Sequence, residues 1–103
     1  MRKIELSAQA QKRLHEITDY YLFHESPERT LKVLDSFDNS FLKIAENPFA
    51  YKKFLSTEFV NLDIRIYAHF NTYHIYFVVY SNMISIAEIF HLKQDPDKRK
   101  LDI

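Results

Sequence analysis

The sequence predicts an α+β domain in which a helical hairpin packs on a mostly antiparallel sheet, in the order β-α-α-β-β-β. Apolar residues recur at helical spacing along two long stretches of the first half. Three stretches rich in β-branched and aromatic residues follow, and the joints between them are short and polar. With 103 residues, 47 % of them hydrophobic, we expect residues 1–103 to form one domain around one core.

The first half is predicted to hold a short strand and then two helices. Residues 3–7 alternate polar and apolar side chains and end at Ser7, a favoured N-cap residue. The helix expected over 8–24 has its apolar face at Ala10, Leu14, Ile17 and Tyr21. The helix expected over 27–46 follows Ser26, ends before Asn47–Pro48, and has an apolar stripe at Leu31, Leu34, Phe37, Phe41 and Ile44.

The second half is predicted to form three paired strands. Residues 49–61 show no clean period, so we expect an irregular loop there. Strands are expected over 62–69, 73–80 and 83–91, the first of them with Ile64 and Ile66 on one side and Arg65 and Tyr67 on the other. Pro96 stops the last strand, and the charged tail over 93–103 is expected to be either frayed or docked.

Composition excludes several classes of function. Glycine and cysteine are both absent, which rules out a phosphate-cradling glycine loop, a disulfide and a thiolate nucleophile. The formal net charge is zero, so the broad basic face of a typical nucleic-acid binder is absent. The N-terminus lacks the apolar region of a signal peptide, and no stretch approaches the length of a membrane helix. We therefore expect a cytoplasmic protein, and no cofactor is indicated.

Two places in the sequence are candidates for function. His91, Lys93 and Asp95 crowd together where the last strand ends, and they predict a reactive site, a docking site or only a solvated strand end. Arg65 lies in the middle of a strand. It suits recognition of an anion or carboxylate, although a cross-strand pair with Glu88 or with an aromatic neighbour explains it equally well.

Aromatic and imidazole side chains suggest a third candidate, a binding surface on the sheet. We expect one face to hold Tyr67, His69, His74, Tyr76 and Tyr80, where it could stack bases or bind a peptide. Tyrosines on a half-exposed sheet are also ordinary strand composition. His69 and His74 flank a tight hairpin, but no third ligand has a useful spacing, so we expect no metal site.

These elements together resemble the RelE/ParE superfamily of bacterial toxins over about residues 4–96. The resemblance rests on motif positions in the first helix, at the end of the second helix and on the three strands: Ala10, Leu14, Ile17 and Tyr20; Asn47–Pro48; Arg65; Tyr73, Ile75 and Phe77; Ile84, Ile86, Ile89 and His91; then Lys93 and Asp95. Phe77 replaces a usual Tyr, and Leu92 and Gln94 stand where Gly and Arg are common.

The resemblance is closer to ParE-like than to RelE-like members. It implies a toxin of a type II toxin–antitoxin module that inhibits growth by binding a protein target, for which the family implies DNA gyrase, and that a cognate antitoxin peptide silences. The residues expected to contact target or partner are Arg65, Tyr67, Tyr76, His91 and Lys93.

Two alternatives stay open. A RelE-like toxin would be an mRNA endonuclease acting on the ribosome, with Arg65 holding the scissile phosphate and His91 as acid or base. The neutral charge of the chain counts against this enzyme and favours a protein without catalysis of its own. A third possibility is an inactive relative whose sheet only binds a partner.

Overall fold

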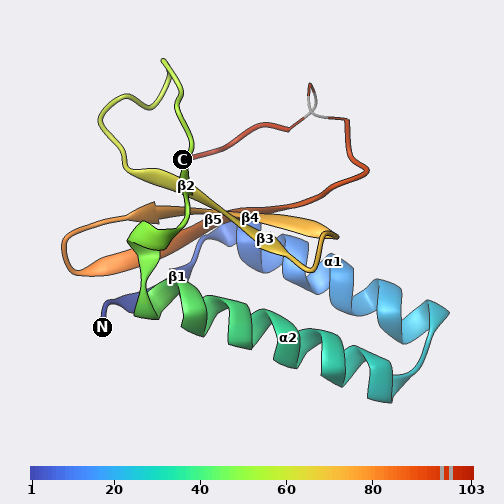
Figure 1. Cartoon of the computed structure of the whole chain (residues 1–103). Coiled ribbons are helices and arrows are strands. Elements are labelled where there is room, and N and C mark those ends of the chain that lie inside the picture. The colour runs from blue at the N-terminus through green and yellow to red at the C-terminus, as the bar shows by residue number, and fades with distance from the viewer. Residues whose placement is uncertain (96, 98) are drawn as a thin grey trace.

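Two helices packed on one face of a five-stranded sheet make up the computed structural model, which describes residues 1–95, 97 and 99–103 (Figure 1). The elements are β1 (Lys3–Leu6), α1 (Ala8–His24), α2 (Pro27–Glu46), the 3₁₀ turn η1 (Pro48–Ala50), β2 (Lys52–Lys53), β3 (Ile64–His69), β4 (Tyr73–Val79) and β5 (Met83–His91). The strand order is β1-β5-β4-β3-β2, with β1 parallel to β5 and all other pairs antiparallel.

The predicted α+β class and the order β-α-α-β-β-β are confirmed, with one addition. The segment expected to be an irregular loop carries η1 and the two-residue edge strand β2, which pairs with β3. A two-residue strand has too few side chains to show a period, so the sequence pattern did not reveal it. Within the described part of the chain, no helix is long and apolar enough to cross a bilayer.

Both helices begin and end where the sequence predicts. The hydroxyl of Ser7 accepts a hydrogen bond from the backbone N–H of Ala10 at 3.1 Å, and Ser26 does the same for Arg29 at 3.1 Å. These N-caps satisfy backbone donors that have no partner inside the helix. Pro27 occupies the first helical position, where its missing N–H costs nothing.

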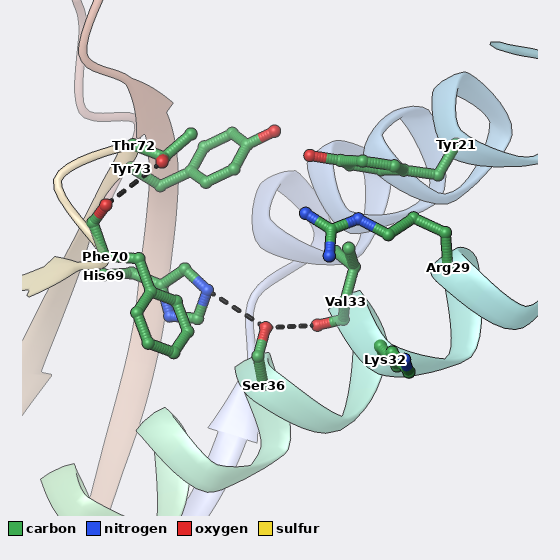
Figure 2. Close-up of a pocket in the computed structure, with 9 residues that line it drawn as sticks. All are labelled: Tyr21, Arg29, Lys32, Val33, Ser36, His69, Phe70, Thr72 and Tyr73. Atoms are coloured by element: carbon green, nitrogen blue, oxygen red, sulfur yellow. Dashed lines mark hydrogen bonds between the residues drawn. The ribbon is translucent and has the colours of Figure 1, made fainter. Parts of the chain in front are cut away.

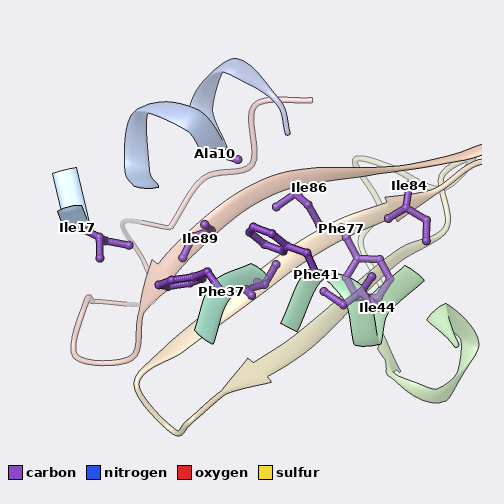
Figure 3. Close-up of a cluster of buried hydrophobic side chains, with 10 residues drawn as sticks. Ala10, Ile17, Phe37, Phe41, Ile44, Phe77, Ile84, Ile86 and Ile89 are labelled. Carbon is purple, nitrogen blue, oxygen red and sulfur yellow. The ribbon is translucent and has the colours of Figure 1, made fainter. Parts of the chain in front are cut away.

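A main core lies between the helices and the sheet, and Figure 3 shows its side chains. Its fully or almost fully buried members are Ala10, Ile17, Phe37, Phe41, Ile44, Ile75, Phe77, Ile84, Ile86 and Ile89. Leu31, predicted for this face, is 63 % exposed, and Thr30 is buried in its place. Leu31 precedes Phe37 by six residues, which is a rotation of about 240° around the helix axis. Its side chain therefore faces away from the sheet. Leu34 is half-buried in the groove between the helices.

A second, smaller core covers the other face of the sheet. Its buried members are Ile64, Tyr76, Val78, Ala87 and Phe90, and the loop after β2 packs on them through Phe54, Phe59 and Leu62. Figure 1 shows this loop and the end of the chain on the side of the sheet opposite the helices. The strict alternation predicted for β3 is confirmed. Its isoleucines face this outer core, while Arg65 and Tyr67 lie on the helix side.

The described part of the C-terminal tail lies on the outer core. Leu101 packs against this cluster, and the guanidinium of Arg99 lies 5.9 Å from the centre of the Phe90 ring. The same guanidinium donates hydrogen bonds to the carbonyls of His91 and Leu92, both at 3.3 Å. β5 ends at His91. Pro96, expected to stop this strand, lies outside the described residues.

A β-bulge in β5 adjoins a partly buried ion pair that the sequence did not predict. Tyr76 pairs with Glu88 and Phe77 with Ile86, so Ala87 has no partner on β4. Glu88 is 2 % exposed, and its carboxylate lies 3.3 Å from the guanidinium of Arg13 on α1. This hydrogen bond raises the pKa of Arg13. The pair fixes α1 to the sheet.

We expect Phe41→Ala to lower the free energy of unfolding by about 3–5 kcal/mol, because Phe41 is a buried member of the main core. Leu31→Ala on the same helix is the matched control and should cost less than about 0.5 kcal/mol, since its side chain is exposed. Urea denaturation followed by circular dichroism measures both. A loss below about 1 kcal/mol for Phe41→Ala would contradict this packing of α2.

Candidate functional site

The five residues predicted to contact a target or partner do not form one surface. Arg65 and Tyr67 lie on the helix side of β3, whereas Tyr76 is buried in the outer core. Arg65 pairs with Phe77, while His91 pairs with Tyr73 at the other end of β4. Four residues of β4 span about 13 Å. Arg65 and His91 are therefore separated along the sheet as well as across it.

Arg65 is held by contacts within the chain. Its Nε donates to the carboxylate of Asp63 at 3.0 Å, and its Nη1 donates to the carbonyl of Tyr51 at 3.0 Å. The guanidinium also lies 5.1 Å from the centre of the Phe49 ring, and the side chain is only 16 % exposed. These contacts tie the η1 segment to β3. The predicted pair with Glu88 is wrong, because Glu88 faces α1.

The predicted face of aromatic and imidazole side chains is split between the two sides of the sheet. His69 faces the helices, whereas Tyr76 belongs to the outer core and His74, two residues before it on β4, lies on the same side. In the observed register Tyr67 pairs with Ile75 and His69 with Tyr73, so His74 and Tyr76 point to the opposite face of the sheet. His69 and His74 consequently cannot share a ligand.

His91 lies at the end of β5, beside the hairpin that joins β3 and β4. Its ring packs edge-on against Tyr73, with 5.1 Å between ring centres. The backbone N–H of Lys93 donates to His91 Nδ1 at 3.0 Å, and no described residue forms a hydrogen bond with Nε2. The carboxylate of Asp95 accepts a hydrogen bond from the N–H of Asp97 at 3.0 Å.

The tip of this hairpin is a tight turn over residues 69–72. The N–H of Thr72 donates to the carbonyl of His69 at 3.0 Å, and the two central residues, Phe70 and Asn71, have φ of 51° and 55°. Two positive φ values are typical of a type I′ turn, which favours Asn and Gly. The chain has no glycine, and a bulky aromatic residue occupies the first of these positions. Phe70 is nevertheless 75 % exposed.

His69 fixes the base of the hairpin to α2. Its ring is 4 % exposed, with Nδ1 2.7 Å from the hydroxyl of Ser40 and Nε2 3.2 Å from that of Ser36. The hydroxyl of Ser36 donates to the carbonyl of Val33 at 2.6 Å. It can therefore only accept from His69, which places the imidazole proton on Nε2 and makes Nδ1 the acceptor for Ser40.

The environment of His69 keeps the ring neutral. The imidazole stacks on Phe37 with 4.2 Å between ring centres. Burial lowers the pKa of His69 from 6.5 to about 4. With both ring nitrogens in hydrogen bonds and no charge at neutral pH, His69 is suited to anchor the hairpin and not to transfer protons.

A pocket of about 360 Å³ opens between the hairpin tip and the helices (Figure 2). The residues that line it are Tyr21, Arg29, Lys32, Val33, Ser36, His69, Phe70, Thr72 and Tyr73. The phenol oxygens of Tyr21 and Tyr73 point toward one another in Figure 2, and the guanidinium of Arg29 extends into the space beside them. Burial raises the pKa of Tyr73 to about 12, so its phenol stays protonated and can donate.

A second pocket of about 380 Å³ lies on the other side of Phe70 and shares Lys32, Ser36 and His69 with the first. Lys43 adds a further cation to its lining, and Asp35 adds a carboxylate. Together these pockets offer cations, neutral donors and aromatic walls, so the arrangement is suited to binding.

Sequence reasoning missed Arg29, Lys32, Ser36 and Ser40 as residues of this site. One signal was present: Ser36 and Ser40 are four residues apart and flank Phe37 on the face of a predicted amphipathic helix. Buried hydroxyls need partners, so two serines on such a face indicate a polar side chain opposite them.

The chain is similar to known proteins both in sequence and in fold. A sequence family described as the ParE toxin of the type II toxin–antitoxin system parDE matches residues 4–96. A solved structure titled "Chromosomal ParDE TA system from P. aeruginosa" has a similar fold, with a TM-score of 0.73 and 18 % sequence identity. The match covers 90 % of this chain and 98 % of that one. A search of curated proteins gave no match.

We expect stability to fall by about 3 kcal/mol through His69 as the pH drops from 7 to 4, because its pKa of about 4 in the folded chain lies below 6.5. The unfolded chain binds the extra proton across this window, so its protonation favours unfolding. Urea denaturation at several pH values, compared with His69→Gln, isolates this contribution. An equal pH dependence in parent and variant would contradict a neutral, buried His69.

Proposed function

The chain belongs to the ParE toxin family of type II toxin–antitoxin systems, and we propose that it inhibits growth by binding DNA gyrase until a cognate antitoxin neutralises it. On this proposal the chain acts by occupying a protein target and catalyses no reaction itself. Since gyrase works on chromosomal DNA, the proposal places the toxin in the cytoplasm.

The main observation that favours binding over catalysis is that Arg65 is occupied by contacts within the chain. An endonuclease needs a free cation beside its general acid or base to hold the scissile phosphate. Arg65 instead bonds Asp63 and Tyr51 and is separated from His91 by about 13 Å of strand. His69 is neutral and bonded at both ring nitrogens. This supports a target-binding toxin over a ribosome-dependent endonuclease.

Exposed apolar side chains support a partner that covers part of the surface. Phe23, Leu31 and Phe70 are each more than 60 % exposed. Exposed aromatic and aliphatic groups rimmed by charge are typical of protein–protein interfaces. An acidic antitoxin segment that folds on binding would fit such a surface.

The proposal predicts that induced expression of the chain arrests growth with altered DNA supercoiling and with intact mRNA. Plasmid topoisomers and primer extension on an abundant transcript, sampled together after induction, measure the two effects. Purified protein should also inhibit supercoiling by gyrase in a defined assay, and added antitoxin should restore it.

His91→Ala and Arg65→Ala are the variants that separate the two mechanisms. Cuts at fixed codon positions in the parent that disappear in both variants would overturn the proposal in favour of an endonuclease. Because Arg65→Ala removes contacts to η1, its folding is checked by circular dichroism, and Lys12→Ala serves as an exposed control on α1. Growth that continues unchanged in the parent would point to an inactive relative.

A further inference from the structure

We infer that Phe70 and the cations beside it, Arg29, Lys32 and Lys43, form a docking site for an acidic peptide segment that inserts an apolar side chain next to the Phe70 ring. The inference rests on the proposed function in one respect, since the antitoxin is the expected source of this segment.

The backbone at Phe70 is the first observation. A bulky aromatic residue at a φ of 51° is in an unfavourable conformation that Asn or Gly would adopt more readily. Burial would compensate for such strain, but Phe70 is 75 % exposed. Among the described aromatic residues its ring pairs only with His69, in an edge-on approach with 4.6 Å between ring centres. Strain that packing does not offset is typical of a residue kept for binding.

The position of the ring between two pockets is the second observation. Phe70 lines both the pocket of about 360 Å³ and the one of about 380 Å³. Val33, Tyr21 and Tyr73 give the first pocket largely apolar walls, as Figure 2 shows. An apolar side chain of a peptide can therefore enter this pocket and pack against the exposed ring.

The excess of positive charge around the Phe70 ring is the third observation, and it indicates an acidic partner. The two pockets are lined by three cations, Arg29, Lys32 and Lys43, against one carboxylate, Asp35, in a chain whose formal net charge is zero. Among the described residues no carboxylate lies within ion-pair distance of Lys32 or Lys43. Arg29 has only a loose, exposed contact with Glu25 at 3.8 Å. The local excess of positive charge favours an acidic segment.

His69 gives this site a fixed geometry. Its hydrogen bonds to Ser36 and Ser40 hold the residue before Phe70 against α2, the helix that carries all three cations. The aromatic ring and the charges are thus positioned before any partner binds, which lowers the entropic cost of association.

A peptide fits these observations better than a nucleic acid does. Stacked bases need aromatic faces along a continuous basic groove. Here one exposed ring lies between a largely apolar pocket and a more polar one, and Asp35 interrupts the row of cations along α2. Aromatic anchors with a rim of Arg and Lys are instead typical of protein interfaces.

Titration of the ¹⁵N-labelled chain with a synthetic peptide rich in Glu around a central Leu pair tests the site directly. We expect amide shifts at Phe70, Thr72, Lys32 and Ser36, and weaker binding as salt rises. The same peptide with Gln in place of Glu should bind at least about tenfold more weakly. The antitoxin, added in a second arm, should shift the same signals.

The variants separate a binding role from a structural one. Phe70→Asn should keep or raise the thermal midpoint, because Asn tolerates positive φ, while the dissociation constant rises at least about tenfold. Asn71→Gly relieves the same turn but keeps the ring, so its affinity should match the parent. Lys32→Glu should weaken binding, and Lys12→Glu, an exposed charge on α1 outside both pockets, should not.

The inference is overturned if neither the Glu-rich peptide nor the antitoxin binds. It is also overturned if Phe70→Asn and Lys32→Glu both bind the peptide with the affinity of the parent. An oligonucleotide of single-stranded DNA that produces the same shifts with higher affinity than the peptide would overturn the assignment of a peptide partner. The peptide arm does not depend on toxicity. A chain that binds the peptide at Phe70 but leaves growth and supercoiling unchanged would contradict the proposed function and leave the site intact.

Discussion

The anchoring of His69 to α2 is the interaction on which the candidate site depends. A two-stranded hairpin tip projecting past its sheet has few contacts of its own, and this one begins at a residue buried between Ser36, Ser40 and Phe37. Both ring nitrogens have hydroxyl partners, so the imidazole is buried without an unsatisfied group. The anchor holds Phe70 over α2 and separates the pockets on its two sides.

The same contacts explain why the chain is suited to binding a partner. Arg65 and His69 are committed to contacts within the chain, and His91 is separated from Arg65 along the sheet. His69 is neutral, Arg65 bonds Asp63 and Tyr51, and His91 packs against Tyr73 at the end of β5. Phe70 and the cations of α2 beside it are exposed around the two pockets, and this combination is typical of an interface.

Sequence periodicity predicted the elements well and the side-chain contacts poorly. The helix ends followed from Ser7 and Ser26, because a cap is a local interaction. Leu31 was misplaced because apolar character was read as burial, although a polar residue, Thr30, occupies the buried position. The partner of Glu88 depends on a bulge in β5, and a shift of register by one residue exchanges the faces of a strand. Such long-range features have no local signal.

The protonation state of His69 tests the central claim most directly. Two-dimensional NMR that correlates the ring nitrogens with the ring protons distinguishes the two neutral tautomers and follows the ring through a pH titration. The account predicts that Nε2 carries the proton and that this form persists down to about pH 4. A ring protonated on Nδ1 at neutral pH, or one that becomes charged near its ordinary pKa of 6.5, would contradict it.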